Sequence, residues 1–82
     1  MALQEVSLDD PLSGLRASNL LIETEVGRAI VRRTRRKSLH KLVAHLPDGR
    51  SSTLTGVPEE RSLRQAAASL TGARPLRAFL LP

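Results

Sequence analysis

The sequence predicts an α+β domain, in which a small, mainly antiparallel sheet of four to five strands has one helix packed on one face. Apolar and polar residues alternate in several short runs between turn-forming residues, as is typical of half-buried strands. One later run has apolar residues at helical spacing instead. The 82 residues, 40% of them apolar, are enough for one domain with a thin core.

The first 19 residues give the weakest structural signal. Turn-forming residues at Asp9-Asp10-Pro11 and Ser13-Gly14 interrupt any periodicity, and acidic residues outnumber basic ones. We therefore expect residues 1–19 to form an acidic, loosely ordered arm and residues 20–82 to form the single α+β domain.

Two strands joined by a tight turn are expected next. Residues 20–26 alternate imperfectly, with two glutamates on one face, which predicts a half-buried strand. A helix over residues 13–25 is the competing interpretation, and periodicity does not exclude it. Gly27-Arg28 fits a two-residue hairpin turn with glycine at its first central position. Residues 29–35 then continue as the second strand.

A second hairpin follows. Residues 39–46 alternate, with Leu42 and Ala44 on one face, and predict a strand. Pro47-Asp48-Gly49 predicts a turn, because proline presets φ, aspartate bonds its own backbone and glycine accepts a positive φ. The segment from residue 50 to residue 57 is rich in serine and threonine and is expected to pair back as the next strand.

The helix has two possible starts. Pro58-Glu59-Glu60 would place proline at the first position and acids in the first turn. The capping box Ser62-Leu63-Arg64-Gln65 would start the helix at Leu63. In both cases Gly72 ends it, and residues 76–81 predict a final strand. The apolar stripe of the helix consists of Leu63, Ala66, Ala67 and Leu70.

Positive charge is concentrated in the middle of the chain. The formal net charge is +5, and the densest basic run is Arg32-Arg33-Thr34-Arg35-Arg36-Lys37. Alternation would send these bases to both faces of a strand, so we expect the run to end a strand and to open into an exposed loop. Guanidinium groups offer planar, bidentate donors to phosphate. The predicted phosphate-binding residues are Arg28, Arg32, Arg33, Arg35, Arg36, Lys37, Lys41 and Arg50.

The composition favours duplex nucleic acid over single strands. Binding of single strands by base stacking needs several exposed aromatic rings, and Phe79 is the only aromatic residue. Contact with the phosphates of duplex RNA or DNA needs none. The leading hypothesis is a small, basic, non-enzymatic regulatory or accessory module that binds duplex nucleic acid. The alternative is a solvated basic edge that only discourages aggregation.

Several other classes of function are disfavoured. Without cysteine there is no disulfide, no cysteine-ligated metal and no thiol nucleophile. His40 and His45 lie an odd number of positions apart, so a strand points them to opposite faces, and no partner motif accompanies them. We expect no metal and no cofactor. No apolar run reaches the roughly 18 residues of a membrane span and no secretory signal is evident, so a cytoplasmic location without membrane contact is expected.

Between residues 27 and 58 the chain resembles one family of small ribonucleases. The shared features are Gly27 followed by Arg32, then Ser38-Leu39-His40, Pro47-Asp48-Gly49-Arg50 and Val57-Pro58 leading to a helix. In these features it is similar to the HicA-type mRNA interferase toxins, which have a double-stranded-RNA-binding-like fold. The resemblance implies a catalytic role for His40 and an RNA contact for Arg32.

From Leu39 onward the chain also resembles a ubiquitin-type β-grasp. A strand, a turn, a strand, a helix from the Ser62 cap and a strand over residues 76–81 follow in the order of that fold. This resemblance implies a protein-binding module without catalysis. Apart from this resemblance, the thin core and the apolar residues 76–81 favour contact with another protein or with a second copy of the chain, through residues 76–81 or a sheet edge.

Overall fold

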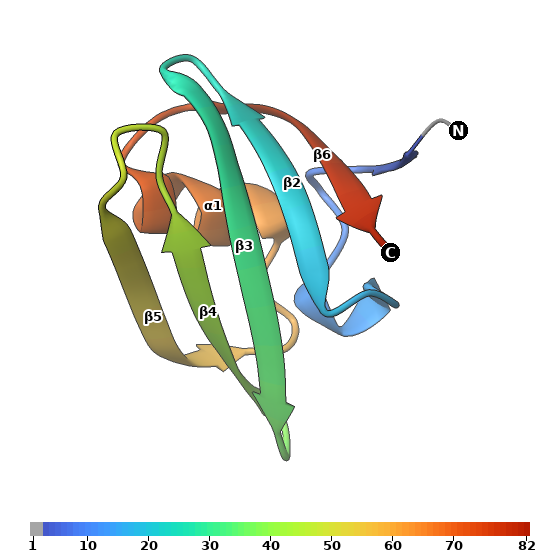
Figure 1. Ribbon diagram of the computed structural model, residues 1–82. Helices are drawn as coiled ribbons and strands as arrows, with labels where there is room; N and C mark the ends of the chain where they lie inside the picture. Colours follow the sequence, from blue (N-terminus) through green and yellow to red (C-terminus); the bar gives the residue numbers. More distant parts are fainter. Residues whose placement is uncertain (1–2) are drawn as a thin grey trace.

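The computed structural model describes residues 3–82 (Figure 1). The chain forms strands, one short 3-10 helix and one α-helix in the order β1 (Gln4–Val6), η1 (Leu12–Gly14), β2 (Asn19–Thr24), β3 (Gly27–Arg36), β4 (Leu39–His45), β5 (Ser51–Pro58), α1 (Leu63–Thr71) and β6 (Pro75–Leu81). Within this part of the chain, no helix has the length and apolar character that crossing a membrane requires.

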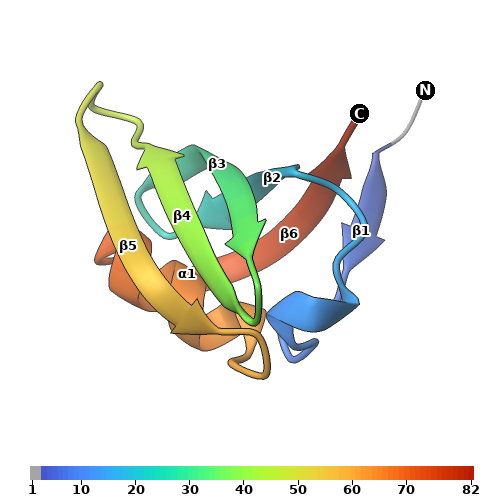
Figure 2. The same ribbon diagram turned by 90° about the horizontal axis from the view of Figure 1, so that it is seen from below.

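All the strands belong to one antiparallel sheet, in the order β1-β6-β2-β3-β4-β5. Strands β2 to β5 follow one another as a meander, and β6 then returns to pair with β2 on its other side. Helix α1 packs against β4, β5 and β6 on one face of the sheet, which we call the inner face (Figure 2). The α+β class is confirmed, but the sheet has six strands rather than four to five.

The core lies between the inner face and α1. The apolar stripe of α1 is buried, as its helical spacing predicts. It packs with alternate residues of the central strands, because side chains two positions apart share one face of a strand. The buried residues of β2, β3 and β4 that belong to the core are Leu20, Ile22, Val31, Leu42 and Ala44.

The N-terminal segment differs from the expected loosely ordered arm. Strand β1 pairs with β6, and Leu8, Leu12 and Leu15 are buried in the core. Backbone bonds also tie the segment to the start of α1, where Leu63 N donates to Asp10 O at 2.9 Å. The turn-forming residues belong to a packed, irregular segment, because its leucines have an apolar surface to cover. Residues 1–2 of the predicted arm lie outside the described residues.

The strand over residues 20–26 is confirmed as β2, and the alternative helix over residues 13–25 is wrong. The turn after it was placed two residues too late, because Glu25 and Val26 form it and Gly27 already pairs with Thr24. The Thr24 hydroxyl fixes this position by donating to Gly27 O at 2.8 Å and accepting from Val26 N at 3.2 Å.

The predictions for the second half hold. Asp48 Oδ1 accepts from Arg50 N at 3.0 Å, and Gly49 has a φ of 90°, so the predicted mechanism of the β4–β5 turn is present. Of the two helix starts, the capping box is used: Ser62 Oγ accepts from Gln65 N at 3.2 Å. Gly72 ends α1 in the left-handed conformation, with a φ of 69°.

Candidate functional site

The basic run lies inside a long hairpin and not in an exposed loop. Strand β3 continues past its last partner in β2, the pair of Arg32 with Asn19, and stays paired with β4 up to Arg36 opposite Leu39. Only Lys37 and Ser38 form the turn, and Lys37 has a φ of 58°. The predicted loop is therefore wrong. A strand carries bases on both faces here because the outer face meets solvent and the inner face offers polar partners.

Bases of the outer face, opposite to α1, form one cluster at the end of this hairpin. Arg32, Thr34 and Arg36 alternate along β3 on this face, and Lys41 of β4 lies opposite Thr34. Lys37 extends the cluster at the turn. All four bases are exposed, and none has a carboxylate within ion-pair distance among residues 3–82. We call Arg32, Arg36, Lys37 and Lys41 the cationic cluster.

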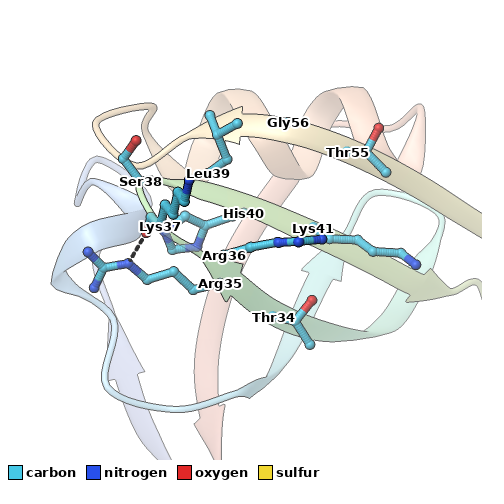
Figure 3. A pocket seen from close by; sticks show the side chains of 10 residues that line it. All are labelled: Thr34, Arg35, Arg36, Lys37, Ser38, Leu39, His40, Lys41, Thr55 and Gly56. Carbon is cyan, nitrogen blue, oxygen red and sulfur yellow. Dashed lines mark hydrogen bonds between the residues drawn. The ribbon is translucent and has the colours of Figure 1, made fainter.

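An open cavity of about 760 Å³ lies at this end of the hairpin (Figure 3). Three bases of the cationic cluster line it, together with the hydroxyl side chains of Thr34, Ser38 and Thr55, and no carboxylate does. A β-bulge shapes its edge, since Thr55 and Gly56 of β5 together oppose Lys41. Gly56 accommodates the bulge with a φ of 64°.

Three other predicted bases are engaged by carboxylates. Arg50 Nε lies 2.6 Å from Asp48 Oδ2, and Arg28 Nε lies 3.9 Å from Glu23 Oε2. Both stand at the opposite end of the sheet, beside the β2–β3 and β4–β5 turns. On the inner face, Arg35 Nη2 lies 3.1 Å from Glu59 Oε2, an ion pair without hydrogen-bond alignment. Arg28 and Arg50 therefore lie away from the cationic cluster, whereas Arg35 lines the same cavity as three of its bases but is paired with Glu59.

The side chain of Arg33 makes hydrogen bonds within the protein. It points to the inner face, where its Nη2 donates to Leu15 O and to Ala17 O, both at 2.8 Å. Its Nη1 donates to His40 Nδ1 at 3.3 Å. The guanidinium therefore joins β3 and β4 to the N-terminal segment. The partners lie 16 and 18 positions away in sequence, so no local pattern identified this role.

His40 is buried on the inner face and His45 is exposed on the outer face, as their spacing predicts. His40 is only 1% exposed. Because Nδ1 accepts from Arg33, the proton is assigned to Nε2, which has no partner among residues 3–82. Burial, with the charges of Arg33 and Arg35, lowers the pKa of His40 below its ordinary value, against an opposing effect of Glu59. The lowered pKa favours the neutral form of His40, and its catalytic role stays a prediction.

The single aromatic ring lies away from the cationic cluster. Phe79 is on the outer face of β6, opposite Leu21 of β2, which in turn lies opposite Ile30 of β3. The guanidinium carbon of Arg77 stands 5.9 Å from the centre of the Phe79 ring. These side chains form an apolar row across the open face. Strand alternation puts Ile30 on this face, and the row reaches Phe79 only because β6 pairs with β2.

We compared the chain with known protein families, curated proteins and solved structures. No protein family, no curated protein and no solved structure matches the chain. The described residues contain no group of three or more side chains that could hold a metal ion. The arrangement of charges therefore carries the functional argument by itself.

Proposed function

We propose that the outer face of the β3–β4 hairpin binds the phosphate backbone of duplex nucleic acid, as a regulatory or accessory module. The observation that carries this proposal is the unpaired cationic cluster. Three of its bases, Arg36, Lys37 and Lys41, line one cavity with three hydroxyl side chains. Arg28, Arg35 and Arg50, in contrast, each have a carboxylate partner. The positive charge of a base without a neighbouring carboxylate is not offset, so it attracts a phosphate more strongly.

The position of the aromatic ring supports a duplex as the ligand. A single strand bound by stacking would need rings beside the cations. Phe79 lies on β6, with β2 between it and β3, and Arg77 already approaches its ring. Phosphate contacts from the cationic cluster require only a backbone with regular charges. Such binding is expected in the micromolar range at physiological salt and depends little on sequence.

A salt series of fluorescence anisotropy with labelled duplex RNA and duplex DNA tests the proposal. Each phosphate contact contributes a slope of roughly −0.9 to the dependence of log affinity on log salt concentration. The test variant carries Arg32→Gln, Arg36→Gln and Lys41→Gln. We expect its slope to be shallower by about 2.7 than that of the natural protein, with thermal unfolding little changed.

A matched control removes the same charge elsewhere. Arg28→Gln, Arg50→Gln and Arg77→Gln change bases that pair with carboxylates, and surface ion pairs of this kind contribute little to stability. We expect this variant to keep most of the salt slope. Equal loss in the two variants would show that net charge alone attracts the duplex, and no binding by the natural protein at low salt would refute the proposal.

A further inference from the structure

The cavity at the end of the β3–β4 hairpin has a rim that is held in place. Arg35 Nε donates to Lys37 O at 2.7 Å (Figure 3), and Glu59 N donates to Ser38 O at 3.2 Å. Both residues of the turn are therefore bonded to the chain beside them. The other lining residues belong to β3, β4 and β5, which pair with one another. A site that is already ordered costs a ligand less conformational entropy than a mobile loop would.

The hydrogen-bond donors of the cavity fall into two groups. In the first, Lys41 lies opposite Thr34 of β3 and, on its other side, opposite the bulge that contains Thr55 of β5. The second group lies at the turn and consists of Arg36, Lys37 and Ser38. Arg36 is two residues, or about 7 Å, beyond Thr34 along β3. Two neighbouring groups of donors match two linked phosphates, because a single phosphate bound at one group would leave the other group without an acceptor.

The positive charge of these groups is not offset. Arg36, Lys37 and Lys41 have no carboxylate within ion-pair distance among residues 3–82, and the lining of the cavity contains none. A phosphate inside a nucleic-acid strand carries a single negative charge, whereas a terminal phosphate carries roughly two and has three free oxygens. Three bases around one cavity therefore favour an anion whose charge is more concentrated than that of a nucleic-acid backbone.

The cavity offers no ring on which a nucleobase would stack. Its lining contains no phenylalanine, tyrosine or tryptophan, and His40, which also lines it, is buried. The exposed apolar side chain of the lining is that of Leu39. Binding of a base without hydrogen bonds to its edges depends on stacking against a ring. The phosphates of a ligand, and not a base, are therefore the groups that this cavity can recognise.

We propose that this cavity is a binding site for free oligophosphates, such as pyrophosphate or the phosphate chain of a nucleotide. The donor group around Lys41 binds one phosphate, and the donor group at the turn binds the next. The site shares bases with the surface proposed to contact a duplex, but the binding of a free oligophosphate does not depend on duplex binding.

Gly56 allows an acid to be placed at the edge of the cavity. It lines the cavity with a φ of 64°, and a Cβ added there would have no atom of a non-neighbouring residue within 4 Å. Aspartate is among the residues that tolerate this left-handed conformation. Gly72, at the end of α1, has a φ of 69° and equally open surroundings. Gly72→Asp is therefore the matched control for Gly56→Asp, with the same change in net charge.

Isothermal titration calorimetry with pyrophosphate, without divalent cations and at constant ionic strength, measures the binding. We expect the natural protein to bind with a dissociation constant below about 1 mM. Gly56→Asp should raise this constant by about tenfold, and Gly72→Asp should change it by less than about twofold. Circular dichroism shows whether both variants are folded. A natural protein that does not bind pyrophosphate, or two folded variants that bind it equally well, overturns the proposal.

Amide chemical shifts of the natural protein decide if Gly56→Asp does not fold. Pyrophosphate should shift the signals of Thr34, Lys41 and Thr55. It should leave those of Arg28 and Arg50, at the opposite end of the sheet, almost unchanged. Equal shifts at both ends would show attraction to net charge without a site and would overturn the proposal.

Inorganic phosphate and two nucleotides test the class of ligand. Inorganic phosphate occupies one donor group only and should bind about tenfold more weakly than pyrophosphate. Adenosine and cytidine triphosphates should bind with affinities within about threefold of each other, because no ring stacks on their bases. Inorganic phosphate that binds as tightly as pyrophosphate, or a strong preference for one base, would overturn the proposal.

The salt series with duplex RNA and DNA separates the oligophosphate site from the proposed function. Pyrophosphate binding without duplex binding would refute the proposed function alone. Duplex binding without pyrophosphate binding would refute the oligophosphate site alone.

Discussion

Arg32 and Arg33 are neighbours in the sequence with different surroundings, because successive strand residues face opposite sides. Arg32 is exposed in the cationic cluster, whereas Arg33 holds two backbone carbonyls and the ring of His40. Strand alternation assigns the two faces correctly. It could not show which of the inner bases has partners, because those partners come from the N-terminal segment.

Substitution of these two arginines by methionine should separate stability from binding. Arg33→Met leaves partly buried acceptors without their donor and should lower the free energy of unfolding by about 1–3 kcal/mol. Arg32→Met should stay within about 0.5 kcal/mol. Denaturant unfolding measures both, and the salt slope of duplex binding should fall for Arg32→Met. Equal loss of stability in the two variants would contradict the structural role of Arg33.

His40 should make the protein less stable in mild acid. Its pKa in the folded protein is below the ordinary value of 6.5, so between these two values the unfolded chain binds a proton that the folded protein does not. The free energy of unfolding should therefore fall as the pH is lowered from about 7.5 to about 5.5. Denaturant unfolding across this range measures the effect.

The two histidines provide the control for this pH dependence. His40→Gln can still accept a hydrogen bond from Arg33 but cannot be protonated, so its stability should depend less on pH over the same range. His45→Gln changes an exposed ring on the outer face and should keep the slope of the natural protein. A slope that disappears in His45→Gln and persists in His40→Gln would show that the buried ring is not the cause.

At the scale of elements, helix α1 depends on its cap. Ser62→Ala removes the acceptor of the Gln65 N–H and should lower the free energy of unfolding by about 1 kcal/mol. Ser69→Ala makes the same chemical change at an exposed position inside α1, where alanine is the better helix former. It should therefore leave stability equal or slightly higher. Thermal unfolding of both variants measures the difference.

Local patterns predicted most elements but not every boundary. The capping box, the Pro47-Asp48-Gly49 turn and the alternating strands act through neighbours in sequence, so the sequence contains their causes. The position of the turn after β2 was not predicted correctly, because the Thr24 hydroxyl, rather than a glycine inside the turn, fixes it. Strand β1 has three residues, too few for a periodic signal, and exists because β6 pairs with it.

At the scale of the whole molecule, the N-terminal segment belongs to the folding unit. The expected domain of residues 20–82 would lack Leu8, Leu12 and Leu15, which are buried in the core. Loss of a buried leucine costs roughly 2–5 kcal/mol, and a small domain has only about 5–15 kcal/mol in total. We expect residues 20–82 alone to show no cooperative thermal unfolding by circular dichroism. A cooperative transition like that of the full chain would instead support a domain that begins at residue 20.

The pairing of Gln4 with Leu80 also bears on how fast the molecule gains and loses its structure. Strands β2 to β5 close short loops, one hairpin after another, whereas β1 closes a loop that spans nearly the whole chain. We therefore expect β1 to join after the rate-limiting step of folding. A contact formed so late slows unfolding and leaves the folding rate almost unchanged. The shortest strand would then govern how long the folded molecule persists.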